Sequence, residues 1–114
     1  MTTNELSKIV LNALEDLKAF DIEILDVTKL TSITDQMIIV SGGSSRQVKA
    51  IADKTLEAVK KHNITPLGVE GVQQGDWALI DLGDIIVHIM RPVIREYYQL
   101  EKLWAPASKQ MSSY

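Results

Sequence analysis

The chain has 114 residues, of which 46% are hydrophobic and 24% are charged, and it contains no cysteine. This length and composition predict one globular domain, and the lack of cysteine excludes disulfides, thiolate zinc sites and a cysteine nucleophile. The formal net charge is −3 and the lysines and arginines are scattered, which disfavours direct nucleic-acid binding as the main activity.

The first element expected is a helix over residues 4–20, because apolar side chains from Leu6 to Leu17 recur at helical spacing. Thr3 or Asn4 can cap its beginning. The acidic residues of this segment argue against a signal sequence or an arginine-rich transit peptide. No apolar stretch of the chain approaches the roughly 20 residues that span a bilayer. We therefore expect a cytoplasmic protein.

Two strands and a second helix follow. Residues 22–27 form a strand, and the continuous apolar run at residues 37–40 is typical of a central strand covered on both faces. Glycines and serines at residues 41–45 break this strand and begin a helix that extends to about His62. Asn63 is expected to end the helix in a left-handed conformation.

The last part of the chain predicts three strands and a final helix. The strands are expected at residues 66–70, 76–82 and 85–90, and the last two form a hairpin with its turn at Gly83 and Asp84. The final helix begins at Pro92, a residue that suits the first helical turn, and ends near Trp104.

This order of elements predicts an α/β (α+β) fold in which three main helices pack on a five-stranded mixed sheet. We expect a single domain over residues 1–104. Residues 105–114 are polar and are expected to form a flexible C-terminal tail.

The Gly42–Gly43 loop is the feature most similar to an enzyme site, because backbone N–H groups at the beginning of a helix can bind phosphate. Its spacing matches neither the P-loop nor the dinucleotide-binding motif, and the favoured interpretation is a sharp turn with Ser44 or Ser45 as a helix cap. A nucleotidyltransferase would need two acids, one residue apart, on the next strand, but residues 66–70 contain one acid. We therefore predict no catalytic, cofactor-binding or metal-binding residue. A nucleotide-binding or nucleotidyltransferase-like enzyme that uses this loop remains the alternative.

The hairpin predicts a binding surface. Alternation along its strands places Trp77 and Leu79 on one face, where they combine with His88 and Met90 of the second strand. This face is apolar enough to need a partner and, from its composition, too polar to form an inner layer. Large aromatic side chains are favoured anchors at protein interfaces.

The final helix carries further aromatic residues. Tyr98 is expected to face outward. The apolar stripe of this helix is expected to pack on the core, and it is formed by Val93, Tyr97, Leu100 and Trp104.

Several segments, in their order and spacing, are similar to those of one family. These segments are Ser32-Ile33-Thr34-Asp35, Ser44-Ser45-Arg46-Gln47-Val48, Ile51-Ala52-Asp53, Gly68-Val69-Glu70-Gly71, Asp76-Trp77, Asp81-Leu82-Gly83-Asp84, Val87-His88 and Arg95-Glu96-Tyr97-Tyr98-Gln99-Leu100-Glu101-Lys102-Leu103-Trp104. From the first helix to Trp104, the chain resembles the ribosomal silencing factor family, RsfS, also called Iojap.

The resemblance implies a protein that is not an enzyme, needs no cofactor and has a nucleotidyltransferase-like fold without the catalytic acids. Such proteins bind the large ribosomal subunit through its ribosomal protein number fourteen. They sterically block joining with the small subunit and so repress translation when nutrients are limited.

Together with the residue pattern, the resemblance predicts a partner-binding surface. Its residues are Trp77, Leu79, Asp76, Asp81, His88, Met90, Tyr98 and Glu101. Trp77 and Tyr98 would be the anchors, and the three acids would meet basic side chains of the ribosomal protein. A homodimer that uses the same surface is a further interpretation that the sequence leaves open.

Overall fold

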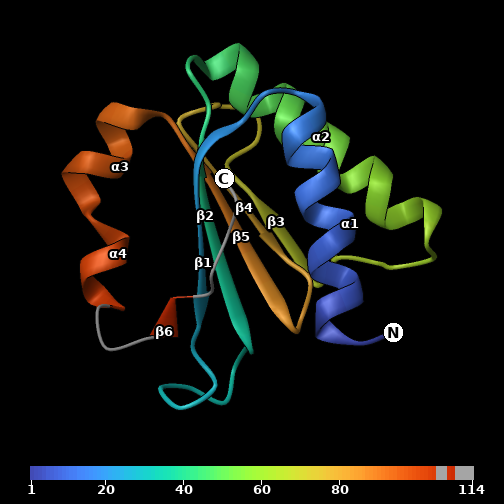
Figure 1. Ribbon diagram of the computed structural model, residues 1–114. Coiled ribbons are helices and arrows are strands. Elements are labelled where there is room, and N and C mark those ends of the chain that lie inside the picture. Colours follow the sequence, from blue (N-terminus) through green and yellow to red (C-terminus); the bar gives the residue numbers. More distant parts are fainter. Residues whose placement is uncertain (105–107, 110–114) are drawn as a thin grey trace.

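The computed structural model describes residues 1–104 and 108–109, and it shows a mixed sheet between two layers of helices (Figure 1). Helices α1 and α2 cover one face, and α3 and α4 lie on the other (Figure 1). The elements in chain order are α1 (Thr3–Asp16), β1 (Phe20–Asp26), β2 (Gln36–Ser41), α2 (Ser45–Lys61), β3 (Gly68–Glu70), β4 (Trp77–Asp81), β5 (Ile85–Met90), α3 (Pro92–Tyr98), α4 (Leu100–Leu103) and β6 (Ser108–Lys109). The predicted α+β class is confirmed.

The strands lie in the order β3-β4-β5-β2-β1-β6. The central pair, β2 and β5, is parallel, and every other neighbouring pair is antiparallel. The five predicted strands of the mixed sheet are confirmed, and the two residues of β6 add a sixth at the edge beside β1. Apart from β6, the predicted flexible tail lies outside the described residues. The likeness to nucleotidyltransferases stays a prediction.

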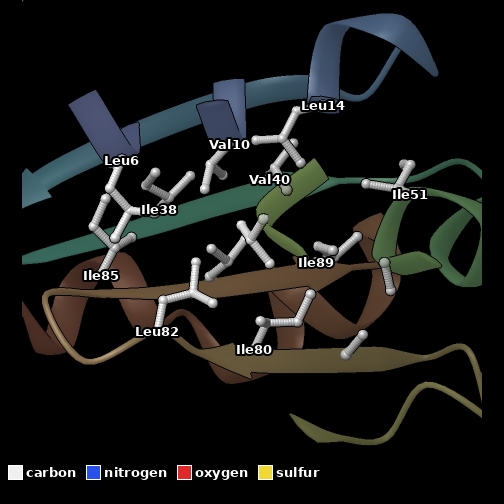
Figure 2. Packing of buried hydrophobic residues seen from close by; sticks show 14 of the residues in the cluster. Leu6, Val10, Leu14, Ile38, Val40, Ile51, Ile80, Leu82, Ile85 and Ile89 are labelled. Atoms are coloured by element: carbon white, nitrogen blue, oxygen red, sulfur yellow. The ribbon is translucent and has the colours of Figure 1, made fainter. Parts of the chain in front are cut away.

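The larger hydrophobic core lies between the sheet and helices α1 and α2 (Figure 2). Leu6, Val10 and Leu14 of α1 recur at helical spacing and point toward the apolar side chains of the central strands. Ile38 of β2 and Ile89 of β5 are fully buried in this cluster. Because each fully buried side chain of this size stabilises the fold by about 1.5–3 kcal/mol, this core is the main source of stability.

A smaller core lies on the opposite face of the sheet. Five buried residues form it: Leu25, Val27, Met37, Ile39 and Met90. Trp77, Ile94, Leu100 and Trp104 pack against them and are only partly buried. The prediction that this face is too polar to form an inner layer was therefore wrong where α3 and α4 cover it.

The helix caps follow the sequence with one shift. Helix α2 begins as predicted, with the Ser44 side chain accepting a hydrogen bond from the N–H of Gln47, and Asn63 after its end has the predicted left-handed conformation, with φ 60°. The cap of α1 is Thr2, and not Thr3 or Asn4, because the Thr2 hydroxyl accepts a hydrogen bond from the N–H of Glu5.

The final helix differs from its prediction. Gln99 adopts a left-handed conformation, with φ 50° and ψ 52°, and it separates α3 from α4. The change of direction brings Ile94, Leu100 and Trp104 onto the smaller core. Val93 and Tyr97, which were expected in the core stripe, are exposed instead.

Candidate functional site: an aromatic surface beside α3

Trp77 begins β4 and lies directly opposite Met90 of β5. The preceding loop brings the chain back close to this strand, and Gly71 makes the approach possible. A Cβ atom at Gly71, where φ is +75°, would come within 2.1 Å of the Trp77 carbonyl oxygen. The loop therefore packs directly against the backbone that carries the Trp77 ring.

His88 holds the Trp77 ring in place. The indole Nε1–H of Trp77 donates a hydrogen bond to Nδ1 of His88 across 3.0 Å. This bond requires a neutral imidazole, with its proton on Nε2. His88 is buried, and the loss of solvation lowers the pKa of His88 to about 4. At neutral pH the imidazole is thus a hydrogen-bond acceptor beneath the indole and carries no charge.

Tyr98, at the end of α3, contacts the Trp77 ring. Its ring centroid is 5.0 Å from that of Trp77, with the two planes tilted by 52°. Tyr97 adds an edge-on contact to Tyr98, also with centroids 5.0 Å apart. Such tilted and edge-on geometries are the favoured ones for aromatic pairs. Tyr98 is 51% exposed and Tyr97 is 80% exposed, so the rings remain open to solvent.

We call Trp77, Tyr97, Tyr98 and Leu79 the aromatic surface. Leu79 is half-buried and lies two residues after Trp77 in β4, opposite His88 in β5 and Glu70 in β3. Tyr97 was predicted to pack on the core and is exposed instead. Helical spacing alone carried no signal for this, because it places Tyr97 in one stripe with Val93, Leu100 and Trp104.

The structure brings Trp77 and Tyr98 together, with Leu79 on the same face of β4 as Trp77, but it buries two other predicted contact residues. Met90 is fully buried within the smaller core, and His88 is 6% exposed. These two side chains support the aromatic surface from below. In this conformation they are positioned to hold Trp77 and not to touch a partner.

Each of the three predicted acidic contacts bonds within the chain. Asp76 forms an ion pair with Arg91, with Nη1 and Oδ1 3.1 Å apart. Asp81 accepts a hydrogen bond from the N–H of Gly83 and stabilises the hairpin turn. Glu101 pairs with the Nε–H of Arg95. The Asp76 side chain stays half exposed, which leaves its carboxylate accessible to a basic group.

The Gly42–Gly43 loop is a tight turn whose backbone donors already have acceptors. The N–H of Gly42 donates to the carbonyl of Met90, and the N–H of Gly43 donates to the side-chain oxygen of Gln47. A Cβ atom at Gly42 would come within 2.9 Å of Val48, so this glycine allows the strand and α2 to approach closely. Phosphate binding here would have to break these bonds.

Among residues 1–104 and 108–109, no group of three or more histidine, aspartate or glutamate side chains is arranged to hold a metal ion. None of the helices in the same part of the chain has the length and apolar character needed to cross a membrane.

The fold and the site define a small α+β protein whose distinctive feature is an exposed aromatic surface. Comparison with known proteins gives the family. The family model described as "Ribosomal silencing factor during starvation" matches residues 1–113. The chain belongs to this family of ribosomal silencing factors, as its sequence pattern predicted. The family is one of ribosome-associated regulators and is not a known family of enzymes.

Individual relatives agree with this assignment. The chain is 45% identical over 104 residues to the ribosomal silencing factor RsfS of Chromobacterium violaceum, covering 91% of this chain and 85% of that protein. It is 49% identical over 100 residues to RsfS of Haemophilus influenzae, covering 88% and 98%. A crystal structure of protein CV0518 from C. violaceum superposes with a TM-score of 0.90 at 42% identity, covering 100% of this chain and 94% of that one.

Proposed function

We propose that this protein binds the large ribosomal subunit through its ribosomal protein number fourteen and sterically blocks joining with the small subunit. Translation would thereby fall when nutrients are limited. The family description supports action on the ribosome during starvation. The observation that carries the proposal is the contiguous cluster of three aromatic rings, in which Tyr97 and Tyr98 are exposed and Trp77 is partly buried.

The name of one relative supports the choice of subunit. A mouse protein called "Mitochondrial assembly of ribosomal large subunit protein 1" is 32% identical over 99 residues, which cover 84% of this chain and 43% of the mouse protein. Its name connects a similar domain with the large subunit. The match spans less than half of the mouse protein, so it supports the choice of subunit and not a shared activity.

Charge supports a basic protein partner. The net charge of the chain is −3, and Asp76 exposes half of its side chain beside Trp77. Ribosomal proteins are generally basic, and opposite charge accelerates the encounter between partners. Large aromatic side chains at the centre of an interface then supply most of the binding free energy. In this protein the aromatic surface would supply the binding free energy, and the Asp76 carboxylate beside it would attract the basic partner.

Co-sedimentation tests the proposal directly. The pure protein is mixed with isolated large and small ribosomal subunits, and joined ribosomes are measured on a sucrose gradient. We expect binding to the large subunit alone and fewer joined ribosomes. The absence of large-subunit binding at micromolar protein would contradict the proposal. Analytical sedimentation of the protein alone, over a range of concentrations, shows whether the protein also forms a homodimer, and a dimer that Trp77→Ala abolishes would use the same surface.

Replacing Trp77 locates the interface. Trp77→Ala removes the central ring and should weaken large-subunit binding by about 2–4 kcal/mol, the cost of losing an interface anchor. Phe20→Ala is the matched control, because Phe20 is a partly exposed aromatic residue at the beginning of β1. Equal losses of affinity in the two variants would show that the interface lies elsewhere. Circular dichroism and melting temperature establish that each variant is folded.

A further inference from the structure

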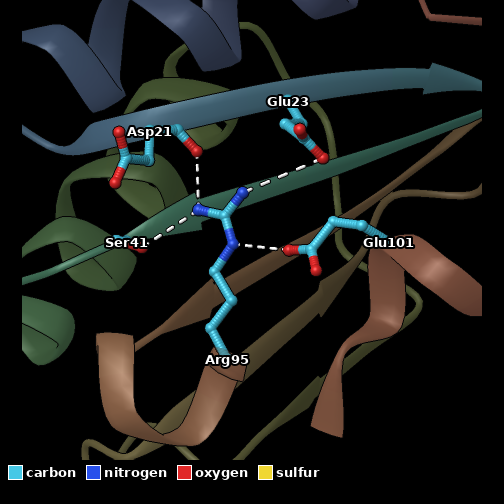
Figure 3. A network of polar contacts seen from close by, with 5 residues as sticks. All are labelled: Asp21, Glu23, Ser41, Arg95 and Glu101. Atoms are coloured by element: carbon cyan, nitrogen blue, oxygen red, sulfur yellow. Dashed lines mark hydrogen bonds and ion pairs between the residues drawn. The ribbon is translucent and has the colours of Figure 1, made fainter. Parts of the chain in front are cut away.

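Arg95 of α3 connects three elements through a side chain that is 13% exposed. Its Nε–H donates to Glu101 of α4 across 2.5 Å. Its Nη1 donates to the Ser41 hydroxyl at the end of β2, at 3.0 Å, and to the Asp21 carbonyl of β1, at 2.6 Å (Figure 3). Glu23 of β1 completes the arrangement as an ion pair, with Oε2 3.9 Å from Nη2 (Figure 3).

An irregularity of β1 supplies one of these acceptors. The register between β1 and β2 shifts between Phe20 and Glu23, and Asp21 has a left-handed conformation, with φ 53°. A residue other than glycine in this region costs about 1–2 kcal/mol. The bulge takes Asp21 out of the regular ladder, so its carbonyl can accept the hydrogen bond from Arg95. The bulge in β1 thus provides a hydrogen-bond acceptor for Arg95.

Apolar packing alone attaches α3 and α4 weakly. The two helices, all of whose residues the structure describes, contain no buried residue, and Ile94, Leu100 and Trp104 are only partly covered. A groove of about 690 Å³ separates the helices from β1 and the end of β2, and Arg95 is one of its lining residues. The Arg95 side chain crosses to both strands, which makes it the main polar connection on this side.

The position of Arg95 in the helix determines what it controls. The beginning of α3 is fixed separately, because Arg91 bonds to Asp76 through both its backbone and its side chain. Arg95 lies one turn further, three residues before Tyr98, and its bond to Glu101 spans the left-handed joint at Gln99. The polar bonds of Arg95 therefore hold the end of α3 that carries the Tyr98 ring, beside the apolar contacts of Ile94 and Leu100.

We propose that Arg95 is a positioning residue for the aromatic surface. Arg95 holds α3 and α4 against β1 and β2, and this places the Tyr98 ring on Trp77. Its guanidinium bonds within the chain, to Asp21, Ser41 and Glu101, so Arg95 affects partner binding through the position of Tyr98. The effect of Arg95 on partner binding rests on the proposed function. The position of the Tyr98 ring does not depend on that function and is measured separately.

Nuclear magnetic resonance tests the placement of the ring. Proton–proton Overhauser contacts between the Trp77 and Tyr98 rings are expected in the unmodified protein, to be lost in Arg95→Ala and to be intermediate in Arg95→Lys. Lysine keeps the charge but lacks the planar set of donors that reaches both strands. Unchanged ring contacts in a folded Arg95→Ala variant would overturn the proposal. If Arg95→Ala does not fold, Ser41→Ala, which removes one acceptor, is judged by the same contacts.

A double-mutant cycle tests the effect on binding to the large ribosomal subunit. Arg95→Ala should weaken binding about tenfold, which corresponds to 1.4 kcal/mol. If Arg95 acts by placing the Tyr98 ring, the same change in a Tyr98→Ala background should have little further effect. Losses that simply add would contradict the proposal. If the unmodified protein does not bind the subunit, the proposed function fails, and the ring contacts alone decide the role of Arg95.

Discussion

The two faces of the sheet are both covered by helices, but the coverage differs in kind. On one face, α1 and α2 cover a continuous apolar cluster of sixteen buried residues, from Leu6 to Ile89. On the other face, α3 and α4 cover five buried residues and are themselves only partly buried. The first face is a complete core, whereas the second combines a small core with polar bonds and exposed rings.

The difference follows from the length and composition of the covering helices. Helix α1 has 14 residues and α2 has 17, each with an apolar stripe long enough to span the strands. Helix α3 has 7 residues and α4 has 4, which is too short for a helix to be stable without contacts to the sheet. An incompletely covered face with aromatic residues at its border is where a partner protein gains the most buried area.

The largest loss of stability is expected from replacing two adjacent residues of β2 whose side chains lie on opposite faces of the sheet. Ile38 and Ile39 of β2 are both fully buried, but Ile38 belongs to the larger core and Ile39 to the smaller one. Replacing either with alanine should cost about 2–5 kcal/mol of unfolding free energy. Ile38→Ala should lie nearer the upper limit, because α3 and α4 can shift into the cavity that Ile39→Ala leaves. Chemical denaturation measures both values.

Binding should rank the same two variants in reverse. Ile39→Ala loosens the packing below Trp77 and α3, so it should weaken binding to the large subunit at temperatures where the protein is folded. Ile38→Ala should leave binding unchanged under these conditions. Equal binding by the two folded variants would show that the aromatic surface does not depend on the smaller core.

A pH titration of stability should reveal the buried imidazole. The pKa of His88 is about 4 in the folded protein, against about 6.5 in an unfolded chain. The unfolded state therefore binds more protons between these values, and stability decreases as the pH falls from 6.5 to 4. This contribution is on the order of 3 kcal/mol, and above pH 6.5 it no longer changes. His88→Gln removes the titration while it keeps a hydrogen-bonding side chain.

The difference between His88→Gln and the unmodified protein isolates this contribution from the carboxyl groups that titrate in the same range. A difference in unfolding free energy that does not change between pH 6.5 and 4 would show that His88 is charged or solvated in the folded protein. The Trp77 indole would then have lost its acceptor.

Sequence periodicity predicted the elements of the larger core well, because long amphipathic helices and β-branched strands determine their own burial. It failed at Gln99, since a left-handed glutamine has no sequence signal and depends on the contacts of Ile94, Leu100 and Trp104 with the sheet. The continuous helix expected up to Trp104 was the better local prediction. Tertiary packing overrode it.

The site was predicted in part for a similar reason. Alternation correctly placed Trp77, Leu79, His88 and Met90 on one face of the hairpin. It could not reveal that His88 and Met90 are buried, or that Arg91 and Arg95 pair with two of the expected acids, because these contacts depend on the tertiary arrangement of the sheet and the final helices. The resemblance supplied the family, while the direction of each side chain required the structure.

The smallest effect separates the two neighbouring tyrosines. Tyr98→Ala should weaken binding to the large subunit by about 1–2 kcal/mol, because this ring is held against Trp77 and needs little ordering when a partner binds. Tyr97→Ala should cost less, since Tyr97 is 80% exposed and its ring contact is to Tyr98. Tyr98→Phe serves as the control, and it should bind almost normally if the ring and not the hydroxyl is the anchor. A larger loss for Tyr97→Ala than for Tyr98→Ala would move the centre of the interface from the sheet to the outer face of α3, so that the partner would contact the covering helices and not the sheet.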